Sequence, residues 1–161
     1  MKIIDSFLPE EELKQLQDIM MGPEFPWYYN NCVAFKEVVS SPHEYYFTHM
    51  FFSDTTQSKY NEIITRIILP KFKWFSLKRI KGNLYASTNK KVTFDYHHDY
   101  DFKHKGMLFS LNTCNGGTIL SNGEVIKSVA NRALFFDPSK EHSCTNCTDA
   151  KGRFNININY I

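Results

Sequence analysis

The chain carries three side chains of the kind that bind transition metals. His97 and Asp99 form a His-x-Asp triplet, and on an extended strand two side chains at this spacing point the same way. His142, further along the chain, is the obvious donor of a third ligand. Two imidazoles and one carboxylate form a facial set that suits Fe(II) and leaves coordination positions open. His97, Asp99 and His142 are therefore the candidate metal ligands and catalytic residues.

The triplet alone is a weak motif, because a surface His–Asp pair would have the same spacing. His142 could likewise cap a loop. If His97 faces a metal ion, His98 points away from it. Asp101 is either a further contact near the site or a solvated loop residue. The histidines that carry no signal beyond that of ordinary polar residues are His43, His49 and His104.

Composition bounds the class of protein. With 161 residues, the chain has the size of one domain that buries a core without disulfide or metal staples. We therefore expect a single domain over residues 1–161. Aromatic residues make up 16% of the chain, which favours β-structure. The formal net charge of +2 is too small to indicate a nucleic-acid or membrane partner.

The sequence predicts a soluble cytoplasmic protein. Its first residues do not resemble a secretory leader, and no apolar run approaches the length that spans a membrane. The four cysteines then fit reduced thiols. Cys144-x-x-Cys147 is half of a zinc site, a redox pair, or two loop thiols without a function. Because no second Cys pair accompanies it, the loop thiols are the favoured interpretation. No pattern indicates an oligomeric state.

Helices are expected in the first half of the chain only. Pro9 and three glutamates give the start of one helix, and Pro70 ends a second one that has a wide apolar face. Between them, aromatic and β-branched residues predict strands. The expected elements are a strand at 3–4, a helix from Pro9 to about Gly22, strands near 27–38 and 45–52, and a helix from Ser53 or Asp54 to about Leu69.

The second half of the chain is expected to be almost entirely strand. Asn122-Gly123 between two short apolar segments is a strong hairpin signal, and Gly82 predicts a bulge within a long strand. The expected strands span 74–87, 107–112, 118–120, 124–129, 133–136 and 153–161. N-terminal helices before about eight antiparallel strands predict a mainly β (α+β) fold. We expect a double-stranded β-helix, or jelly roll, with the helices packed on one outer sheet.

The last strand shows strict alternation. Its apolar residues share one face, while Arg153, Asn155, Asn157 and Asn159 share the other. A plain surface strand would show the same pattern. In a jelly roll whose helices cover the outer sheet, the polar row would instead line the interior, where a small charged molecule needs hydrogen-bond donors.

From about Asn83 to Tyr160 the sequence resembles the 2-oxoglutarate- and Fe(II)-dependent oxygenases. It is most similar to the compact kind often found in bacteriophages, close to the prolyl 4-hydroxylase branch. The matches are short, but they occur in the family's order over nearly half of the chain. They are Asn83-Leu84-Tyr85, His97-x-Asp99, Leu111-Asn112, Gly116-Gly117-Thr118, Asn131-Arg132-Ala133-Leu134-Phe135-Phe136, His142-Ser143 and Arg153-Phe154-Asn155.

The resemblance implies a set of roles. His97, Asp99 and His142 would hold iron, and Arg153 would bind the far carboxylate of 2-oxoglutarate, because a guanidinium is planar, permanently charged and able to bind both oxygens. Further candidates for cosubstrate binding are Tyr85 and Asn155. The implied cofactors are Fe(II), the cosubstrate 2-oxoglutarate and O2, with ascorbate as a candidate reductant.

The implied reaction is hydroxylation of a C–H bond with release of succinate and CO2. The favoured substrate class is a peptidyl proline or a similar side chain, so that the partner is a peptide, a protein or a small molecule. A phage-encoded protein would act in the host cytoplasm. The loops expected to select the substrate, near 25–50 and 100–106, carry no legible code.

The sequence departs from the family's pattern in two places. Relatives often carry tyrosine where this chain has Phe109, so one hydroxyl contact to the cosubstrate is in doubt. Relatives that repair alkylated nucleic acids carry a second arginine six residues after the first, where this chain has Asn159. Oxidative demethylation of nucleic acid is therefore the second choice. A non-catalytic jelly-roll binding module is the alternative of another class.

Lysines and aromatic residues alternate around Lys71-Phe72-Lys73-Trp74-Phe75. Such a stretch can bind nucleic acid. The favoured interpretation is a strand with solvated lysines and buried aromatic rings.

Overall fold

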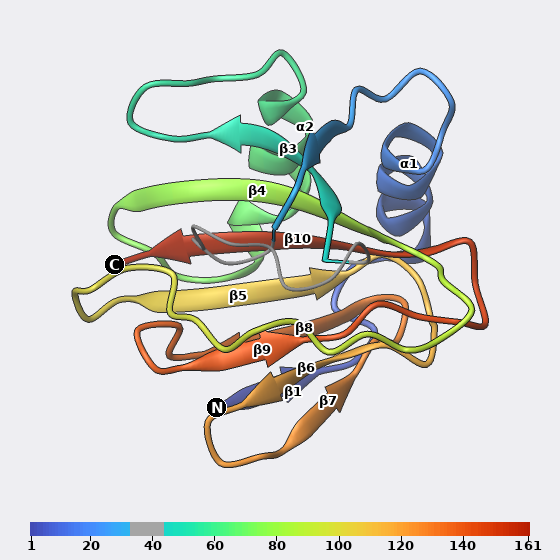
Figure 1. Ribbon diagram of the computed structural model, residues 1–161. Coiled ribbons are helices and arrows are strands. Elements are labelled where there is room, and N and C mark those ends of the chain that lie inside the picture. The colour runs from blue at the N-terminus through green and yellow to red at the C-terminus, as the bar shows by residue number, and fades with distance from the viewer. Residues whose placement is uncertain (33–43) are drawn as a thin grey trace.

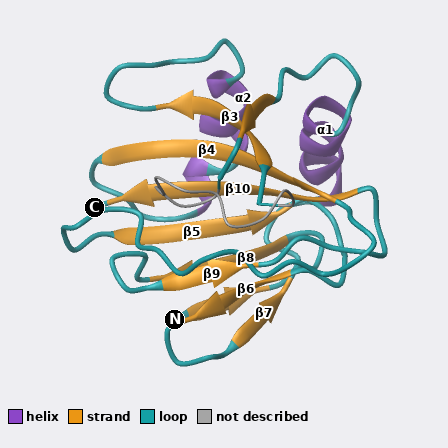
Figure 2. Ribbon diagram, in the orientation of Figure 1, coloured by secondary structure: helices purple, strands orange, loops and turns teal. Residues whose placement is uncertain are grey.

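The chain forms two antiparallel sheets in a computed structural model that describes residues 1–32 and 44–161 (Figure 2). A seven-stranded sheet has the order β1-β8-β5-β10-β4-β3-β2, and a three-stranded sheet has the order β7-β6-β9. The strands are β1 (Lys2–Ile4), β2 (Tyr28–Asn30), β3 (Tyr46–Phe52), β4 (Leu77–Ala86), β5 (Lys105–Ser110), β6 (Gly117–Leu120), β7 (Val125–Lys127), β8 (Arg132–Phe136), β9 (His142–Cys144) and β10 (Gly152–Tyr160). This mainly β arrangement matches the predicted jelly roll.

The helices cover the outer face of the larger sheet. They are α1 (Glu10–Met20) and α2 (Asn61–Ile67), followed by the 3₁₀ helix η1 (Leu69–Lys71). Figure 1 shows α2 behind β3 and β4. The main apolar core consists of the buried faces of both helices and the outward-facing residues of the sheet. It contains Leu13, Leu16 and Met20 of α1, Ile64 and Ile67 of α2, and Ile80, Phe109, Ile156 and Ile158 of the sheet. Helices packed on one outer sheet were predicted correctly. None of the described helices has the length and apolar character that crossing a membrane requires.

The prediction of two N-terminal helices is wrong, because α2 follows β2 and β3. The second helix also begins at Asn61 rather than at Ser53 or Asp54. Residues 53–58 instead form a turn, in which the Ser53 amide donates to the Thr56 carbonyl and the Ser58 amide donates to Phe51. The chain must complete this turn before it can enter the helix.

Several strand boundaries differ from the prediction. Of the strand expected near 27–38, the structure has only β2, and residues 33–38, like His43, lie outside the described residues. The segment before β4 is not a strand, and Trp74 and Phe75 are 42% and 88% exposed rather than buried. The three residues of β9 were expected as loop. The hairpin at Asn122-Gly123 is confirmed, since β6 pairs with β7 across it.

Gly82 does not mark a bulge. It pairs in regular register with Ile156 of β10 and with His49 of β3. A Cβ atom at this position would lie 3.0 Å from Met20 Cε, 3.1 Å from a Phe51 ring carbon and 3.3 Å from Trp27. A glycine is needed here because α1 and the aromatic core approach the strand closely.

We predict that Gly82→Ala lowers the free energy of unfolding by about 1–3 kcal/mol, because the added methyl group overpacks this core. Where the site has room, the same substitution usually stabilises by about 0.4–1 kcal/mol, since it restricts the unfolded chain. Urea unfolding therefore distinguishes the two cases by whether the free energy of unfolding falls or rises. An equally stable or more stable variant would contradict the close packing of β4 against α1.

Candidate active site

A polar cavity lies between the two sheets and is lined by the inward-facing residues of β4 and β10. The register sets Arg153 opposite Tyr85, Asn155 opposite Asn83, Asn157 opposite Lys81 and Asn159 opposite Arg79. The polar row on the last strand thus faces the interior, as the alternation suggested. The space enclosed by these residues, including the solvent at its mouth, is about 430 Å³.

All six site residues predicted from the sequence line this cavity. They are His97, Asp99, His142, Arg153, Tyr85 and Asn155. They come from β4, β9, β10 and the extended segment that follows β4. Residues far apart in the chain therefore meet at one place, which neither a surface His–Asp pair nor a loop cap would require.

The three candidate metal ligands converge from two segments. His97 and His142 face each other in an isolated antiparallel bridge, in which each backbone amide donates to the other residue's carbonyl at 2.9 Å. Asp99 lies two residues beyond His97 on the same segment. One potential ligand atom from each of the three side chains lies within 4.8 Å of the other two. This geometry allows one ion to contact all three.

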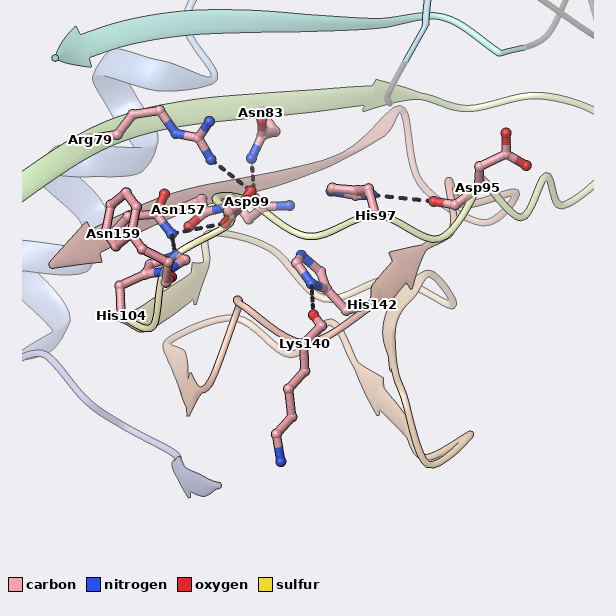
Figure 3. Close-up of polar contacts among 12 residues, drawn as sticks. Arg79, Asn83, Asp95, His97, Asp99, His104, Lys140, His142, Asn157 and Asn159 are labelled. Atoms are coloured by element: carbon pink, nitrogen blue, oxygen red, sulfur yellow. Dashed lines mark hydrogen bonds and ion pairs between the residues drawn. The ribbon is translucent and has the colours of Figure 1, made fainter. Parts of the chain in front are cut away.

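Both histidines are held in the orientation that a metal ligand needs. His97 Nδ1 lies 3.2 Å from the Asp95 carbonyl, and His142 Nδ1 lies 3.0 Å from the Lys140 carbonyl (Figure 3). A carbonyl accepts only from an N–H, so Nδ1 carries the proton in each ring and the Nε2 lone pair is left for a metal. Burial and the nearby His142 lower the pKa of His97 to about 4, which keeps its ring neutral at physiological pH.

The Asp99 carboxylate is held by three side chains. Arg79 Nη2 donates to Oδ1 at 2.7 Å, while Asn157 Nδ2 and Asn159 Nδ2 donate to Oδ2 at 3.1 and 2.9 Å (Figure 3). Burial raises the pKa of Asp99, but Arg79, Lys81, His142 and the hydrogen bond from Asn159 outweigh it and hold this pKa well below its usual range. Asp99 is therefore ionised and oriented, as a ligand must be.

Sequence reasoning did not identify three residues around these ligands. Arg79 pairs with Asp99, and His104 Nε2 accepts from Asn159 Nδ2 at 3.2 Å. Lys81 lines the cavity with its ammonium 5.6 Å from the centre of the Tyr46 ring. Burial and the neighbouring Arg79 lower the pKa of Lys81 to about 8. The alternation of β4 could have identified Arg79 and Lys81, because they share a face with Tyr85.

Arg153 is fully buried in the part of the cavity next to Tyr85, nearer the start of β10 than the asparagines that contact Asp99. Its Nη2 donates to Thr118 Oγ1 at 2.8 Å, and its Nη1 donates to the Thr145 carbonyl at 3.2 Å. Among the described residues, its Nε has no partner. A Cβ atom at position 116 would lie 2.9 Å from Arg153 Cδ, so Gly116 makes room for this side chain. The guanidinium is fixed in place and still has N–H groups for a carboxylate.

Tyr85 and Asn155 lie beside this guanidinium. The Arg153 guanidinium carbon lies 5.4 Å from the centre of the Tyr85 ring, which stacks on Tyr46. Asn155 Oδ1 accepts from Asn83 Nδ2 at 2.9 Å, and within the described part of the chain Asn155 Nδ2 is a buried donor without a partner. This arrangement offers additional polar contacts to a small anion bound by Arg153.

The structure also places the residues of uncertain role. His98 is exposed and points away from the candidate ligands, as expected, and Asp101 lies in solvent, where it accepts from His98 Nε2 at 2.6 Å. Asp101 therefore does not contact the cavity. Phe109 faces the outer core against Phe7, with ring centres 6.0 Å apart. An aromatic hydroxyl at position 109 would not reach the cavity, so the absence of tyrosine removes no contact there.

The donor set fits the cofactors that the sequence implied. Two imidazole Nε2 atoms and one carboxylate suit Fe(II). The N–H groups of Arg153 and Asn155 that have no partner among the described residues suit an acidic cosubstrate. The two sets lie at different levels of one cavity. A molecule could therefore contact the metal at one end and the guanidinium at the other.

Comparisons with known proteins identify the fold. No protein-family model matches the sequence, and no curated protein matches it significantly. Among solved structures, a 2-oxoglutarate–Fe(II) oxygenase family protein from Burkholderia pseudomallei matches with a TM-score of 0.70 at 12% identity, over 98% of this chain and 83% of the other. A Trichoplax adhaerens prolyl hydroxylase, solved with a hypoxia-inducible factor peptide fragment, matches with a TM-score of 0.67 at 14% identity, over 99% and 82%.

A third match is a prolyl 4-hydroxylase from Pseudomonas putida, with a TM-score of 0.59 at 12% identity over 99% of this chain and 91% of the other. At these identities, the likeness concerns the fold. The chain therefore has the fold of the 2-oxoglutarate- and Fe(II)-dependent oxygenases, prolyl 4-hydroxylases included.

Proposed function

We propose that this protein is an Fe(II)- and 2-oxoglutarate-dependent dioxygenase that hydroxylates a C–H bond of its substrate. One observation carries the proposal: His97, Asp99 and His142 bring three ligand atoms within 4.8 Å of one another, in the same cavity as the buried Arg153. The first set suits Fe(II), and the second suits the carboxylate of a 2-oxo acid. A plain binding module would need neither.

Each residue has a defined task in this proposal. His97 and His142 present Nε2 to the metal, because their Nδ1 atoms are engaged by backbone carbonyls. Asp99 adds one carboxylate oxygen and is oriented by Arg79, Asn157 and Asn159. These three ligands would hold a bound metal from one side, so that its other side would stay open to further molecules.

Arg153 would bind the far carboxylate of 2-oxoglutarate, with Asn155 and Tyr85 beside it. Its burial excludes water from the ion pair, which strengthens the contact. When bound, the cofactors supply the oxidising power: 2-oxoglutarate, O2 and a C–H bond give succinate, CO2 and a C–OH bond. The chain itself supplies position and protection.

For the substrate, we propose a peptidyl proline or a similar side chain. Support comes from the fold, which this chain shares with prolyl hydroxylases, one of them solved with a peptide. Exposed aromatic side chains provide surfaces on which a peptide could pack. They include Tyr28, Tyr29, Tyr96 and Phe102.

Succinate release tests the reaction and the substrate class together. We expect Fe(II)-dependent conversion of 2-oxoglutarate to succinate, stimulated by proline-containing peptides more than by methylated oligonucleotides or free amino acids. The hydroxylated product should gain one oxygen atom in mass spectrometry. Stimulation by another class alone would overturn the peptide proposal but not the dioxygenase.

Oxidative demethylation of nucleic acid is the second candidate. The observation in its favour is the exposure of Trp74 and Phe75 beside Lys73, since exposed rings next to cations can stack on bases. Against it, Asn159 lies where the repair enzymes carry an arginine, and its amide is already engaged by Asp99 and His104. Stimulation by methylated oligonucleotides in the same assay would favour this candidate.

A further inference from the structure

A second cluster of metal-ligating side chains lies outside the cavity. Cys114, in the loop before β6, and Cys147, in the loop after β9, meet at one place together with Asp149. One ligand atom from each of these three side chains lies within 4.8 Å of the other two. None of the three lines the cavity that holds the proposed iron ligands.

The sequence favoured Cys144 and Cys147 as loop thiols without a function, and the alternatives paired these two with each other. Cys144 is not a loop thiol, because it is buried in β9 and lines the cavity beside Tyr85. Cys147 pairs instead with Cys114, which is 33 positions earlier. The cluster of candidate ligands is therefore not Cys144-x-x-Cys147 but Cys114 together with Cys147-x-Asp149.

The two loops hold these side chains in a fixed arrangement. Asn115 Nδ2 donates to Thr148 Oγ1 at 2.8 Å, and the Thr148 amide donates back to Asn115 Oδ1 at 3.0 Å. The Asn115 amide also donates to Asp149 Oδ1 at 2.9 Å. Residues next to all three candidate ligands are thus bound to one another, so the ligands are brought together before any ion binds.

Two of the three side chains are buried, and the third reaches solvent. Cys147 and Cys114 are 0% and 6% exposed, whereas Asp149 is exposed to solvent. The Cys147 thiol donates to the Ala150 carbonyl at 3.7 Å, so a cation that binds its sulfur must displace this proton. A cation that enters from the Asp149 side would meet two sulfur atoms within the protein.

We propose that Cys114, Cys147 and Asp149 form a binding site for a thiophilic divalent cation, Zn²⁺ in particular. Binding releases the two thiol protons, and two thiolates and one carboxylate then occupy three of the four tetrahedral positions that Zn²⁺ prefers, with water in the fourth. Thiolate selects Zn²⁺ at this site, while imidazole and carboxylate suit Fe(II) in the cavity.

The site would stabilise the walls of the cavity. The loop that contains Cys147 also provides the Thr145 carbonyl that accepts from Arg153, and Gly116, two residues after Cys114, packs beside the Arg153 side chain. A cation that joins the two loops would fix this part of the cavity. The inference stands independently of the proposed reaction, since it rests only on the second cluster.

Cobalt substitution tests the site with a signal that only thiolate ligands give. We expect reduced wild-type protein, titrated anaerobically with Co²⁺, to develop thiolate-to-cobalt charge-transfer absorption in the near ultraviolet that saturates at one thiolate-bound ion per chain. Zn²⁺ should abolish this signal by displacement. The candidate iron site contains no sulfur ligand, so it does not contribute to this signal.

Substitutions of single residues show which side chains give rise to the thiolate-to-cobalt absorption. Cys147→Ser should abolish it, and Asp149→Asn should weaken cobalt affinity at least about tenfold, because it removes one charged ligand. Asp149 is exposed, so its variant should fold even if Cys147→Ser does not. Cys32→Ser and Cys144→Ser are the matched controls and should keep the full signal. Zn²⁺ should also raise the Tm of wild-type protein more than that of Asp149→Asn.

Two outcomes would overturn the inference. The first is folded, reduced wild-type protein without any thiolate-to-cobalt absorption, which would make Cys114 and Cys147 packed thiols only. The second is a signal that survives in both Cys147→Ser and Asp149→Asn but is lost in Cys144→Ser, which would assign the cation to the cavity.

Discussion

Asp99→Ala should abolish succinate formation, because only two protein ligands would remain for iron. A two-ligand chelate is much weaker, and since loss of a residue that merely orients a ligand already costs about 10–100-fold in metal affinity, loss of the ligand itself should cost more. Iron binding is measured by equilibrium dialysis under anaerobic conditions, and succinate is measured in the same preparations.

Asp101→Ala is the matched control. It removes a carboxylate two residues away that lies in solvent, so iron affinity and turnover should be unchanged. Asp99→Ala also leaves the partly buried Arg79 without its partner, which can destabilise the fold. His142→Ala, with His98→Ala as its control, therefore repeats the test without removing that ion pair. Full turnover in either ligand variant would show that the ligand assignment is wrong.

Arg153→Ala should retain Fe(II) but lose most of its affinity for 2-oxoglutarate. The variant removes a charge-assisted, bidentate contact and leaves a carboxylate unpaired in a partly dry cavity, at a cost on the order of 2–5 kcal/mol. This corresponds to roughly 30-fold to several-thousand-fold in apparent affinity. Arg153→Lys should recover part of it, because the charge remains while the planar fork does not. Anaerobic titration of 2-oxoglutarate at fixed iron measures the midpoint.

Arg132→Ala is the control for this experiment. Arg132 pairs with Asp5, with Nε 2.6 Å from Oδ1, and does not line the cavity. Its loss should leave the midpoint unchanged. An unchanged midpoint in Arg153→Ala would instead make Arg153 a structural residue that only joins Thr118 to the Thr145 carbonyl. Lys81 would then be the cavity cation to test next.

Short-range periodicity predicted which face of two extended segments lines the candidate site. The alternation of Arg153, Asn155, Asn157 and Asn159 identified the interior face of the last strand, and the His-x-Asp spacing identified two side chains that point the same way. Both signals depend on the period of two of extended chain. Because they do not depend on the rest of the fold, they could be predicted from the sequence.

Features that depend on contacts between distant parts of the chain could not be predicted from the sequence. Arg79 contacts Asp99 only because the segment after β4 returns to that strand, 20 positions further along the chain. Cys114 meets Cys147 only because two loops are joined. The start of α2 was predicted too early because residues 53–58 form a hydrogen-bonded turn that local propensity does not reveal. Gly82 was interpreted as a bulge because the sequence cannot show how closely α1 approaches the strand.

The most direct test of the central claim is anaerobic addition of Fe(II) and then 2-oxoglutarate to the wild-type protein. A 2-oxo acid that chelates protein-bound iron gives a weak visible charge-transfer band. We predict that this band appears only with both components, saturates at one iron and one 2-oxoglutarate per chain, and is absent in His142→Ala. A folded wild-type protein that shows no band would contradict the account and would leave a non-catalytic binding module as the better description of this fold.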